Sequence, residues 1–239
     1  MLSPLLNDIY AGNQKAISRG ISLVVNDDRF DEELNTLITS DTPIVGITGP
    51  PGAGKSTLTD KIIGELVREG NNVAVLCIDP SSPFTKGAIL GDRIRMSDWY
   101  DNPSVYIRSL ATRGSLGGLP ERAGKVIQLL KAAAFDYILI ETVGVGQNEV
   151  QIAALADCTL VVLVPESGDE IQFMKAGLME IADIFVVNKC DRPGADIFAN
   201  DIRAMLHGTS KKVVKTIATT KQGVGELVSA LKYSLEKKL

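Results

Sequence analysis

A glycine-rich segment that contains one lysine carries the clearest chemistry in the sequence. It fits the pattern G-x-x-x-x-G-K-[ST] and reads Gly49-Pro50-Pro51-Gly52-Ala53-Gly54-Lys55-Ser56-Thr57. A β-branched run precedes it and a helical pattern follows, so successive backbone N–H groups can curl around phosphate oxygens at a helix N-terminus. In such a loop Lys55 bridges the β and γ phosphates and the Ser56 hydroxyl binds Mg²⁺. The segment therefore predicts a nucleotide site.

A second polar segment indicates which base is bound. Asn188, Lys189, Cys190 and Asp191 follow the apolar run 184–187, so they are expected at the carboxyl end of a strand, where open α/β sheets bind ligands. A carboxylate there accepts from guanine N1–H and N2–H₂ together, whereas adenine offers no such pair of donors. Desolvating an unmatched Asp191 costs several kcal/mol, which favours GTP over ATP.

Three carboxylates are candidates for the metal. Asp79 ends a β-branched run, Asp92 follows in a loop flanked by glycine, and Glu141 ends another run. Mg²⁺ needs only one or two carboxylates beside phosphates and water, so the alternative that one of them caps a helix or turn stays open. Glu141 and Gly144 stand where many GTPases carry Asp-x-x-Gly, which would bring the Gly144 N–H to the γ-phosphate. With Lys55, these two residues are the candidates for catalysis.

Composition limits the classes of function. The 239 residues are 45% hydrophobic and 23% charged with a net charge of −4, which excludes general disorder and a broad basic surface for nucleic acid. No apolar stretch reaches the ~18 residues needed to cross a bilayer, and the N-terminus lacks the pattern of a signal peptide. Three scattered cysteines suit reduced thiols. We expect a cytoplasmic protein whose partners include neither nucleic acid nor a membrane.

The periodicity predicts an α/β fold with a mostly parallel sheet and helices on both faces. Strands are expected at Pro43–Thr48, Asn72–Ile78, Ser104–Ser109, Tyr137–Glu141, Cys158–Val164, Ile184–Asn188 and Val213–Ile217. Helices are expected at Ser56–Glu69, Leu119–Ala134, Asn148–Leu155, Glu170–Ile181, Ala195–Leu206 and Val224–Glu236. Residues 1–40 read as a helical cap, broken at Gly12 and Gly20, that packs on a nucleotide-binding domain formed by residues 41–239.

Three long segments, Asp79–Met96, Ser109–Gly118 and Glu141–Glu149, resemble the MeaB/ArgK/MMAA family of G proteins, and the match runs from about Gly12 to Gly225. The resemblance implies a P-loop GTPase of the SIMIBI type, with Asp79, Asp92 and Glu141 near Mg²⁺. It implies a chaperone that uses GTP binding and hydrolysis to gate adenosylcobalamin loading onto a methylmalonyl-CoA mutase-type acyl-CoA mutase, and to protect that enzyme. Cobalamin adenosyltransferase is a further candidate partner.

The chain departs from the family pattern in three places. The segment from Asp191 to Ile217 is shorter than usual. A second loop is expected to contact the base besides the segment Asn188–Asp191. It reads Ile217-Ala218-Thr219 in place of Ser-Ala, which loses a hydroxyl but would leave the Ala218 N–H available to guanine O6. The sequence stops at Leu239, before the helical arm that dimerises family members, so a homodimer stays an open question.

Two other functions remain as alternatives. A GTP-dependent metallochaperone of the same class calls for His-rich or Cys/His clusters, whereas His207 is the only histidine. A guanine-nucleotide sensor would bind but not hydrolyse. For a GTPase we expect slow turnover without a partner, and Arg93, Arg95, Arg108 and Arg113 could each contact phosphate or pair with a surface acid.

Overall fold

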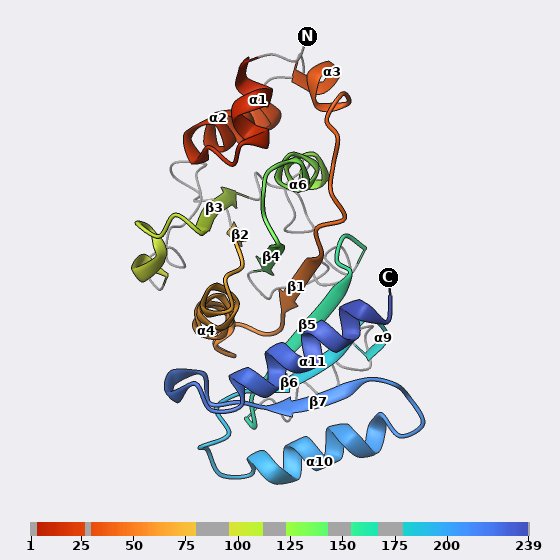
Figure 1. Ribbon diagram of the computed structural model, residues 1–239. Coiled ribbons are helices and arrows are strands. Elements are labelled where there is room, and N and C mark those ends of the chain that lie inside the picture. The colour runs from red at the N-terminus through yellow and green to blue at the C-terminus, as the bar shows by residue number, and fades with distance from the viewer. Residues whose placement is uncertain are drawn as a thin grey trace.

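The sheet organises the molecule. The computed structural model describes residues 4–26, 30–79, 96–111, 123–142, 154–166 and 179–238. Within these residues one seven-stranded sheet has the order β3-β2-β4-β1-β5-β6-β7, and all its pairings are parallel (Figure 1). The strands are β1 (Ile44–Thr48), β2 (Val73–Asp79), β3 (Val105–Ala111), β4 (Tyr137–Thr142), β5 (Cys158–Leu163), β6 (Ile184–Val187) and β7 (Lys212–Lys215).

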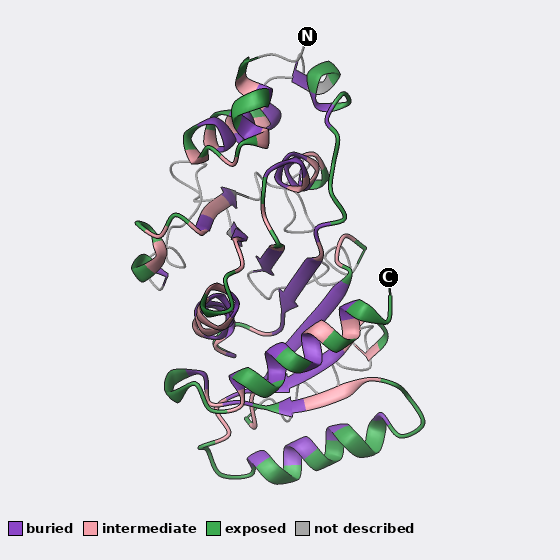
Figure 2. Ribbon diagram, in the orientation of Figure 1, coloured by how far each residue is buried: buried purple, intermediate pink, exposed green. Residues whose placement is uncertain are grey.

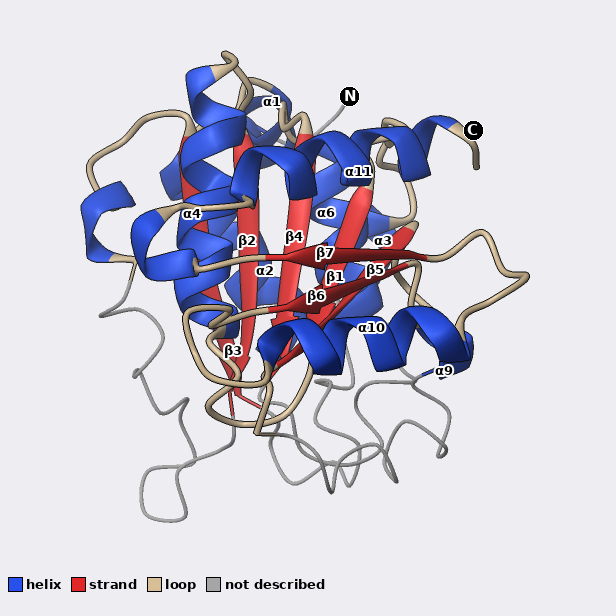
Figure 3. Cartoon of the chain, turned by 90° about the horizontal axis from the view of Figure 1, so that it is seen from below, coloured by secondary structure: helices blue, strands red, loops and turns tan. Residues whose placement is uncertain are grey.

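Burial on both faces explains the continuous apolar runs. Every residue of β1, β5 and β6 is buried, and Figure 2 shows β1 and β5 as buried along their length. Helices must therefore cover both sides, as the sequence predicts. Figure 3 shows β6 and β7 turned strongly away from the direction of β2 and β4, which is the twist expected of a large parallel sheet. The predicted fold class is confirmed.

Two helical layers enclose the sheet. On one face α4 and α11 pack against alternate side chains of the central strands, among them Val45, Val75 and Leu160. On the other face α6 covers β2 and β4, with α1 to α3 outside it, and α10 covers β5 and β6. The longer helices are α1 (Pro4–Tyr10), α2 (Gln14–Asn26), α4 (Lys55–Arg68), α6 (Ala123–Ala132), α10 (Ala195–Met205) and α11 (Val224–Glu236). Short turns of helix are α3 (Asp31–Leu34), η2 (Ser97–Trp99), α9 (Met179–Ile181) and η5 (Ala218–Thr220).

The two glycines predicted to break the N-terminal helices behave differently. Gly12 separates α1 from α2 and has a φ of 75°. The predicted break at Gly20 is wrong, because Gly20 lies buried inside α2. A Cβ added there would meet Leu129 Cδ1 at 2.8 Å and Ile9 Cδ1 at 2.9 Å. The glycine is thus present for the close packing of α2 on α6 and α1.

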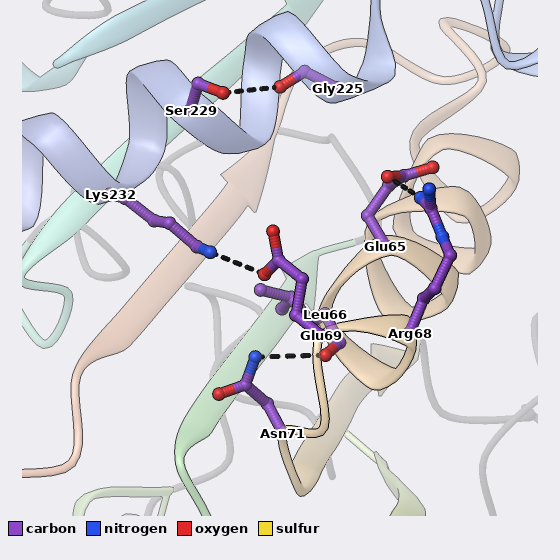
Figure 4. Close-up of polar contacts among 8 residues, drawn as sticks. All are labelled: Glu65, Leu66, Arg68, Glu69, Asn71, Gly225, Ser229 and Lys232. Atoms are coloured by element: carbon purple, nitrogen blue, oxygen red, sulfur yellow. Dashed lines mark hydrogen bonds and ion pairs between the residues drawn. The ribbon is translucent and has the colours of Figure 1, made fainter.

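The far end of α4 is fixed by α11. Figure 4 shows the Lys232 ammonium of α11 paired with the carboxylate of Glu69, which caps the carboxyl end of α4. The Asn71 side chain donates to the Leu66 carbonyl oxygen at 3.0 Å and closes the last turn of that helix. Because α4 begins at the glycine-rich segment, these contacts also hold the helix that supports that segment.

Two predicted helices fall mainly on residues outside the described ranges. Of Asn148–Leu155 only the last two residues are described, as a turn, and of Glu170–Ile181 only α9. None of the described helices is long and apolar enough to cross a bilayer.

Candidate nucleotide-binding site

The glycine-rich segment forms a curled loop between β1 and α4, and two of its glycines are required by close contacts. Gly49 has a φ of 133°, and a Cβ there would lie 2.0 Å from the Val162 carbonyl oxygen of β5. Gly54 has a φ of 89°, and a Cβ there would lie 2.5 Å from Asn188 Nδ2. The loop residues Gly49, Pro50, Pro51, Gly52, Ala53 and Gly54 thus pass against both β5 and the polar segment after β6.

The lysine of the loop lies inside the curl. Lys55 is the first residue of α4 and is only 7% exposed. Its ammonium donates to the carbonyl oxygens of Gly49 at 2.8 Å and Pro50 at 3.0 Å. A positive charge held at a helix N-terminus beside a concave backbone is an arrangement that favours a polyphosphate.

A buried oxygen pair lies next to the lysine. The Ser56 hydroxyl donates to Glu141 Oε1 at 2.5 Å, and both residues are nearly inaccessible to solvent. Glu141 reaches this position because β4 lies beside β1, and the Thr142 hydroxyl donates to that of Thr48 at 3.1 Å at the ends of the two strands. A hydroxyl and a carboxylate are the hard oxygen ligands that Mg²⁺ prefers, so these residues fit the metal.

The other predicted metal and catalytic residues are not all described. Asp79 ends β2, two residues beyond the Cys77–Glu141 register pair, which places its backbone near the same edge of the sheet. The Asp79 side chain, Asp92 and Gly144 lie outside what the structure describes. Among the described residues, no three His, Cys, Asp or Glu side chains gather into a metal-binding group.

Asn188 connects the loops of the site. Its Nδ2 donates to the Ala53 carbonyl oxygen at 2.9 Å, and its Oδ1 accepts from the Thr216 hydroxyl and the Ala218 N–H, both at 3.1 Å. The Ala218 N–H thus already donates to Asn188, and its predicted contact with guanine O6 stays a prediction. The sequence pattern did not mark Thr216, since a single threonine before the loop has no motif of its own.

A pocket opens between the glycine-rich segment, hereafter the phosphate loop, and the two segments that follow β6 and β7. It is lined by Gly54, Thr57, Asn188, Lys189, Asp191, Arg192, Ile217, Ala218 and Thr219. Lys189 has a φ of 57° and its ammonium donates to the Gly52 carbonyl oxygen at 2.7 Å, so its side chain crosses from the pocket to the phosphate loop. Asp191 is exposed at the pocket, where its carboxylate can accept from a ligand. Eight of the residues predicted from the sequence to bind nucleotide therefore line this pocket, and one of them, Gly54, belongs to the glycine-rich loop.

Arg192 is a pocket residue that the motif did not indicate, because the four-residue pattern ends one position earlier. Its Nη1 donates to Glu166 Oε1 at 2.5 Å, and this hydrogen bond with the adjoining positive charge lowers the pKa of the Glu166 carboxyl group. Glu166 follows β5 and also carried no signal in the sequence. Arg192 and Glu166 are brought together by the fold, and no sequence motif indicates either of them.

Several residues with titratable side chains lie outside the lining of this pocket. The Cys190 thiol donates to the Val187 carbonyl oxygen at 3.0 Å, and burial raises its pKa. His207 is exposed after α10. Arg108 lies on the edge strand β3 and donates to the Ser22 hydroxyl of α2, which turns it toward the N-terminal helices. Arg93, Arg95 and Arg113 lie outside the described residues.

A parallel sheet with a phosphate loop after β1 and an Asn-Lys-x-Asp segment after β6 defines a P-loop GTPase. The model of the family described as methylmalonyl Co-A mutase-associated GTPase MeaB matches residues 29–237. The chain belongs to this family, which confirms the resemblance, and it is a GTPase that binds GTP and GDP.

Relatives and a solved structure agree with this assignment. A protein of Pyrococcus abyssi, whose name gives GTPase as a provisional activity, is 49% identical over 99% of this chain and 76% of its own length. GTPase ArgK of Escherichia coli is 40% identical over 78% of this chain and 60% of its own length. The crystal structure of an LAO/AO transport system kinase superposes with a TM-score of 0.78 at 28% identity, covering 99% of this chain and 76% of that chain.

Proposed function

We propose that this GTPase is a cytoplasmic chaperone of an adenosylcobalamin-dependent acyl-CoA mutase of the methylmalonyl-CoA mutase type. In this role GTP binding and hydrolysis gate cofactor loading and protect the loaded enzyme. The observation that carries the proposal is the family match over residues 29–237, which spans the phosphate loop, Glu141 and the base pocket together. Relatives named only as GTPases support the hydrolysis but do not name a partner.

At the phosphate end of the site, the proposed role of Lys55 follows from its position in the loop. Lys55 now donates to two loop carbonyl oxygens, and in our proposal it turns this charge to the β and γ phosphates when nucleotide enters. The N–H groups of the loop and of the first turn of α4 bind the same oxygens. Because transfer of the γ-phosphoryl group depends on charge stabilisation, Lys55 contributes to the rate as well as to affinity.

The metal end rests on the buried pair. Mg²⁺, when bound, neutralises charge on the phosphate oxygens. Ser56 and Glu141 would hold it, with Asp79 and Asp92 as further candidates. The hydrogen bond between the two buried groups fixes the serine hydroxyl where the loop meets α4. Gly144 is proposed to report the γ-phosphate through its N–H.

The base end provides guanine selectivity. Asp191 is the proposed acceptor for the guanine edge, and Asn188 acts through position, since its three hydrogen bonds hold the loops that shape the pocket. Lys189, Ile217, Ala218 and Thr219 form the walls.

The test of the proposal is the GTPase rate as a function of added mutase. We expect a slow basal rate that rises when an adenosylcobalamin-dependent acyl-CoA mutase is added, and mutase affinity that differs between the GTP and GDP states, because binding linkage is reciprocal. Cobalamin adenosyltransferase added as a third component tests the further partner. Lys55→Ala serves as the hydrolysis-deficient control.

The outcomes separate the alternatives. The chaperone role would be contradicted if the protein hydrolyses GTP but no candidate mutase binds to it or changes its GTPase rate. GTP binding with no hydrolysis, even with the mutase present, would instead favour the nucleotide sensor.

A further inference from the structure

Two cationic side chains flank the pocket, and each is held by a partner from a different element. Lys189 is tied to the phosphate loop through the Gly52 carbonyl oxygen at 2.7 Å. Arg192 is tied to Glu166 at 2.5 Å, across to the segment that follows β5. The base pocket thus has a second cation, Arg192, that is not itself part of the Asn-Lys-x-Asp motif.

The local backbone also directs Arg192 to the pocket. Its N–H donates to the Lys189 carbonyl oxygen at 3.0 Å, which closes a turn within the base loop, while Lys189 itself takes a positive φ. This turn places residues 189, 191 and 192 along the pocket lining. Arg192 thus lines the pocket while its guanidinium is paired with the Glu166 carboxylate.

A guanidinium has properties that an ammonium lacks at such a place. It is planar, weakly hydrated and always charged, and it stacks on aromatic rings while its edge keeps a hydrogen bond. A purine ring in the pocket presents such an aromatic face. Because Arg192 is already held through its edge by Glu166, it loses little conformational freedom when a base arrives.

We propose that Arg192 contacts the purine ring of the bound nucleotide through the face of its guanidinium, and that Glu166 is the positioning residue that holds it there. This inference rests on the proposed base site and adds a contact that the base-selective Asp191 does not make. Asp191 recognises the edge of the base, whereas Arg192 stabilises any purine that enters.

The proposal is tested by GDP affinity measured calorimetrically on the full chain with Mg²⁺ present. We expect Arg192→Ala to weaken GDP binding about tenfold, as is typical for loss of a stacking cation on a base. Arg192→Lys keeps the charge but not the plane, so we expect it to lose most of the same affinity. Arg203→Ala on α10, where Arg203 donates to the Asn200 side chain at the surface, is the matched control and should leave affinity unchanged.

A second measurement separates a base contact from a general structural role. Inorganic pyrophosphate has no base, so its affinity should be the same in wild type and Arg192→Ala. Glu166→Ala should weaken GDP about threefold in the wild-type background and have no further effect when Arg192 is already alanine. Full GDP affinity in Arg192→Lys, or an equal loss of pyrophosphate binding, would overturn the stacking contact.

Asp191→Asn, assayed in parallel, distinguishes failure of this inference from failure of the base site. If Asp191→Asn changes the preference from GDP to xanthosine diphosphate while Arg192→Ala has wild-type affinity, the pocket binds the base and the Arg192 inference alone is wrong. If Asp191→Asn leaves the preference unchanged, the base lies elsewhere and both are wrong.

Discussion

Gly54 lies so close to Asn188 that a side chain added at Gly54 would displace the Asn188 amide. At a φ of 89° an alanine costs ~1–2 kcal/mol in backbone strain, and its Cβ would also lie 2.5 Å from Asn188 Nδ2. That amide would have to give up its hydrogen bond to the Ala53 carbonyl oxygen. We therefore expect Gly54→Ala to weaken GTP and GDP binding by at least about tenfold, as measured by calorimetry.

Gly70 offers a matched control for this substitution. It has the same φ of 89°, but nothing lies within 4 Å of an added Cβ, and it follows the far end of α4. Gly70→Ala should cost a similar ~1–2 kcal/mol in folding free energy and leave nucleotide affinity unchanged. Equal nucleotide affinities in the two variants would show that the contact between Gly54 and Asn188 does not govern nucleotide binding.

A substitution of Asp191 that changes one side-chain atom tests whether the pocket binds guanine. Replacing a carboxylate oxygen by an amide NH₂ removes an acceptor for the guanine donors and supplies a donor for the additional carbonyl of xanthine. Asp191→Asn should weaken GDP binding by ~10²-fold or more and improve binding of xanthosine diphosphate. Competition between the two nucleotides measures this preference, and an unchanged ranking would contradict the assignment.

The segment that leads into β3 is fastened to α4 through a tryptophan. Trp99 Nε1 donates to Asp60 Oδ1 at 2.6 Å, and Asp60 is 7% exposed on the second turn of α4. The indole ring packs where Gly64 has no side chain, with ring carbons 3.4 and 3.6 Å from the position of an added Cβ. Met96, three residues earlier, is fully buried in the same core. The helix that supports the phosphate loop is thus also packed against the entry to the edge strand.

Trp99→Phe keeps an aromatic ring but removes the indole donor. Leaving buried Asp60 with fewer partners should cost ~1–3 kcal/mol, which lowers Tm by about 2–10 °C for a chain of this size. Calorimetric unfolding measures the shift. In an Asp60→Asn background the cost of Trp99→Phe should shrink, and an undiminished cost would assign the effect to packing instead of the hydrogen bond.

The strands could be predicted from the sequence because a strand that is buried on both faces needs a continuous run of apolar residues. All seven predicted strands and the positions of α4, α10 and α11 follow from that periodicity and from the glycines between elements. The break predicted at Gly20 is wrong because a glycine in a helical pattern indicates either a break or a close helix contact, and the sequence does not distinguish the two. Arg192 and Thr216 could not be found at all, since their roles depend on which loops the sheet order brings together.

At the scale of the whole molecule, polar contacts join the N-terminal helices to the sheet. Gln14, Ser18 and Ser22 recur every four residues on α2 and contact three residues of β3: the Val105 carbonyl oxygen, the Tyr106 hydroxyl and the Arg108 guanidinium. Gly20 on the same helix faces α6, so α2 packs against both the edge strand β3 and the helix α6. The separation of residues 1–40 from 41–239 as two units stays a prediction, but the packing between α2 and the sheet is continuous.

Cys158 makes the stability of the whole molecule sensitive to alkali. It begins β5 beneath α11, where burial raises the pKa of its thiol to about 12, with the Asp183 carboxylate adding to the shift and Lys238 and Ser234 opposing it. The ordinary value is 9.0. Between these two pH values the unfolded chain loses the proton while the folded chain keeps it. The favourable effect is therefore complete below pH ~9 and is lost as the pH rises toward ~12.

Urea unfolding at a series of pH values from 7 to about 10.5 measures this contribution. In the wild type, Cys158 should reduce the free energy of unfolding by up to about 1.4 kcal/mol per pH unit above pH ~9. Cys158→Ala and Cys158→Ser differ in polarity and so should differ in stability at neutral pH, yet neither side chain titrates in this range. Both variants should therefore share the same shallower decline with pH. A decline as steep as that of the wild type would mean that other groups, and not the buried thiol, govern the loss of stability in alkali.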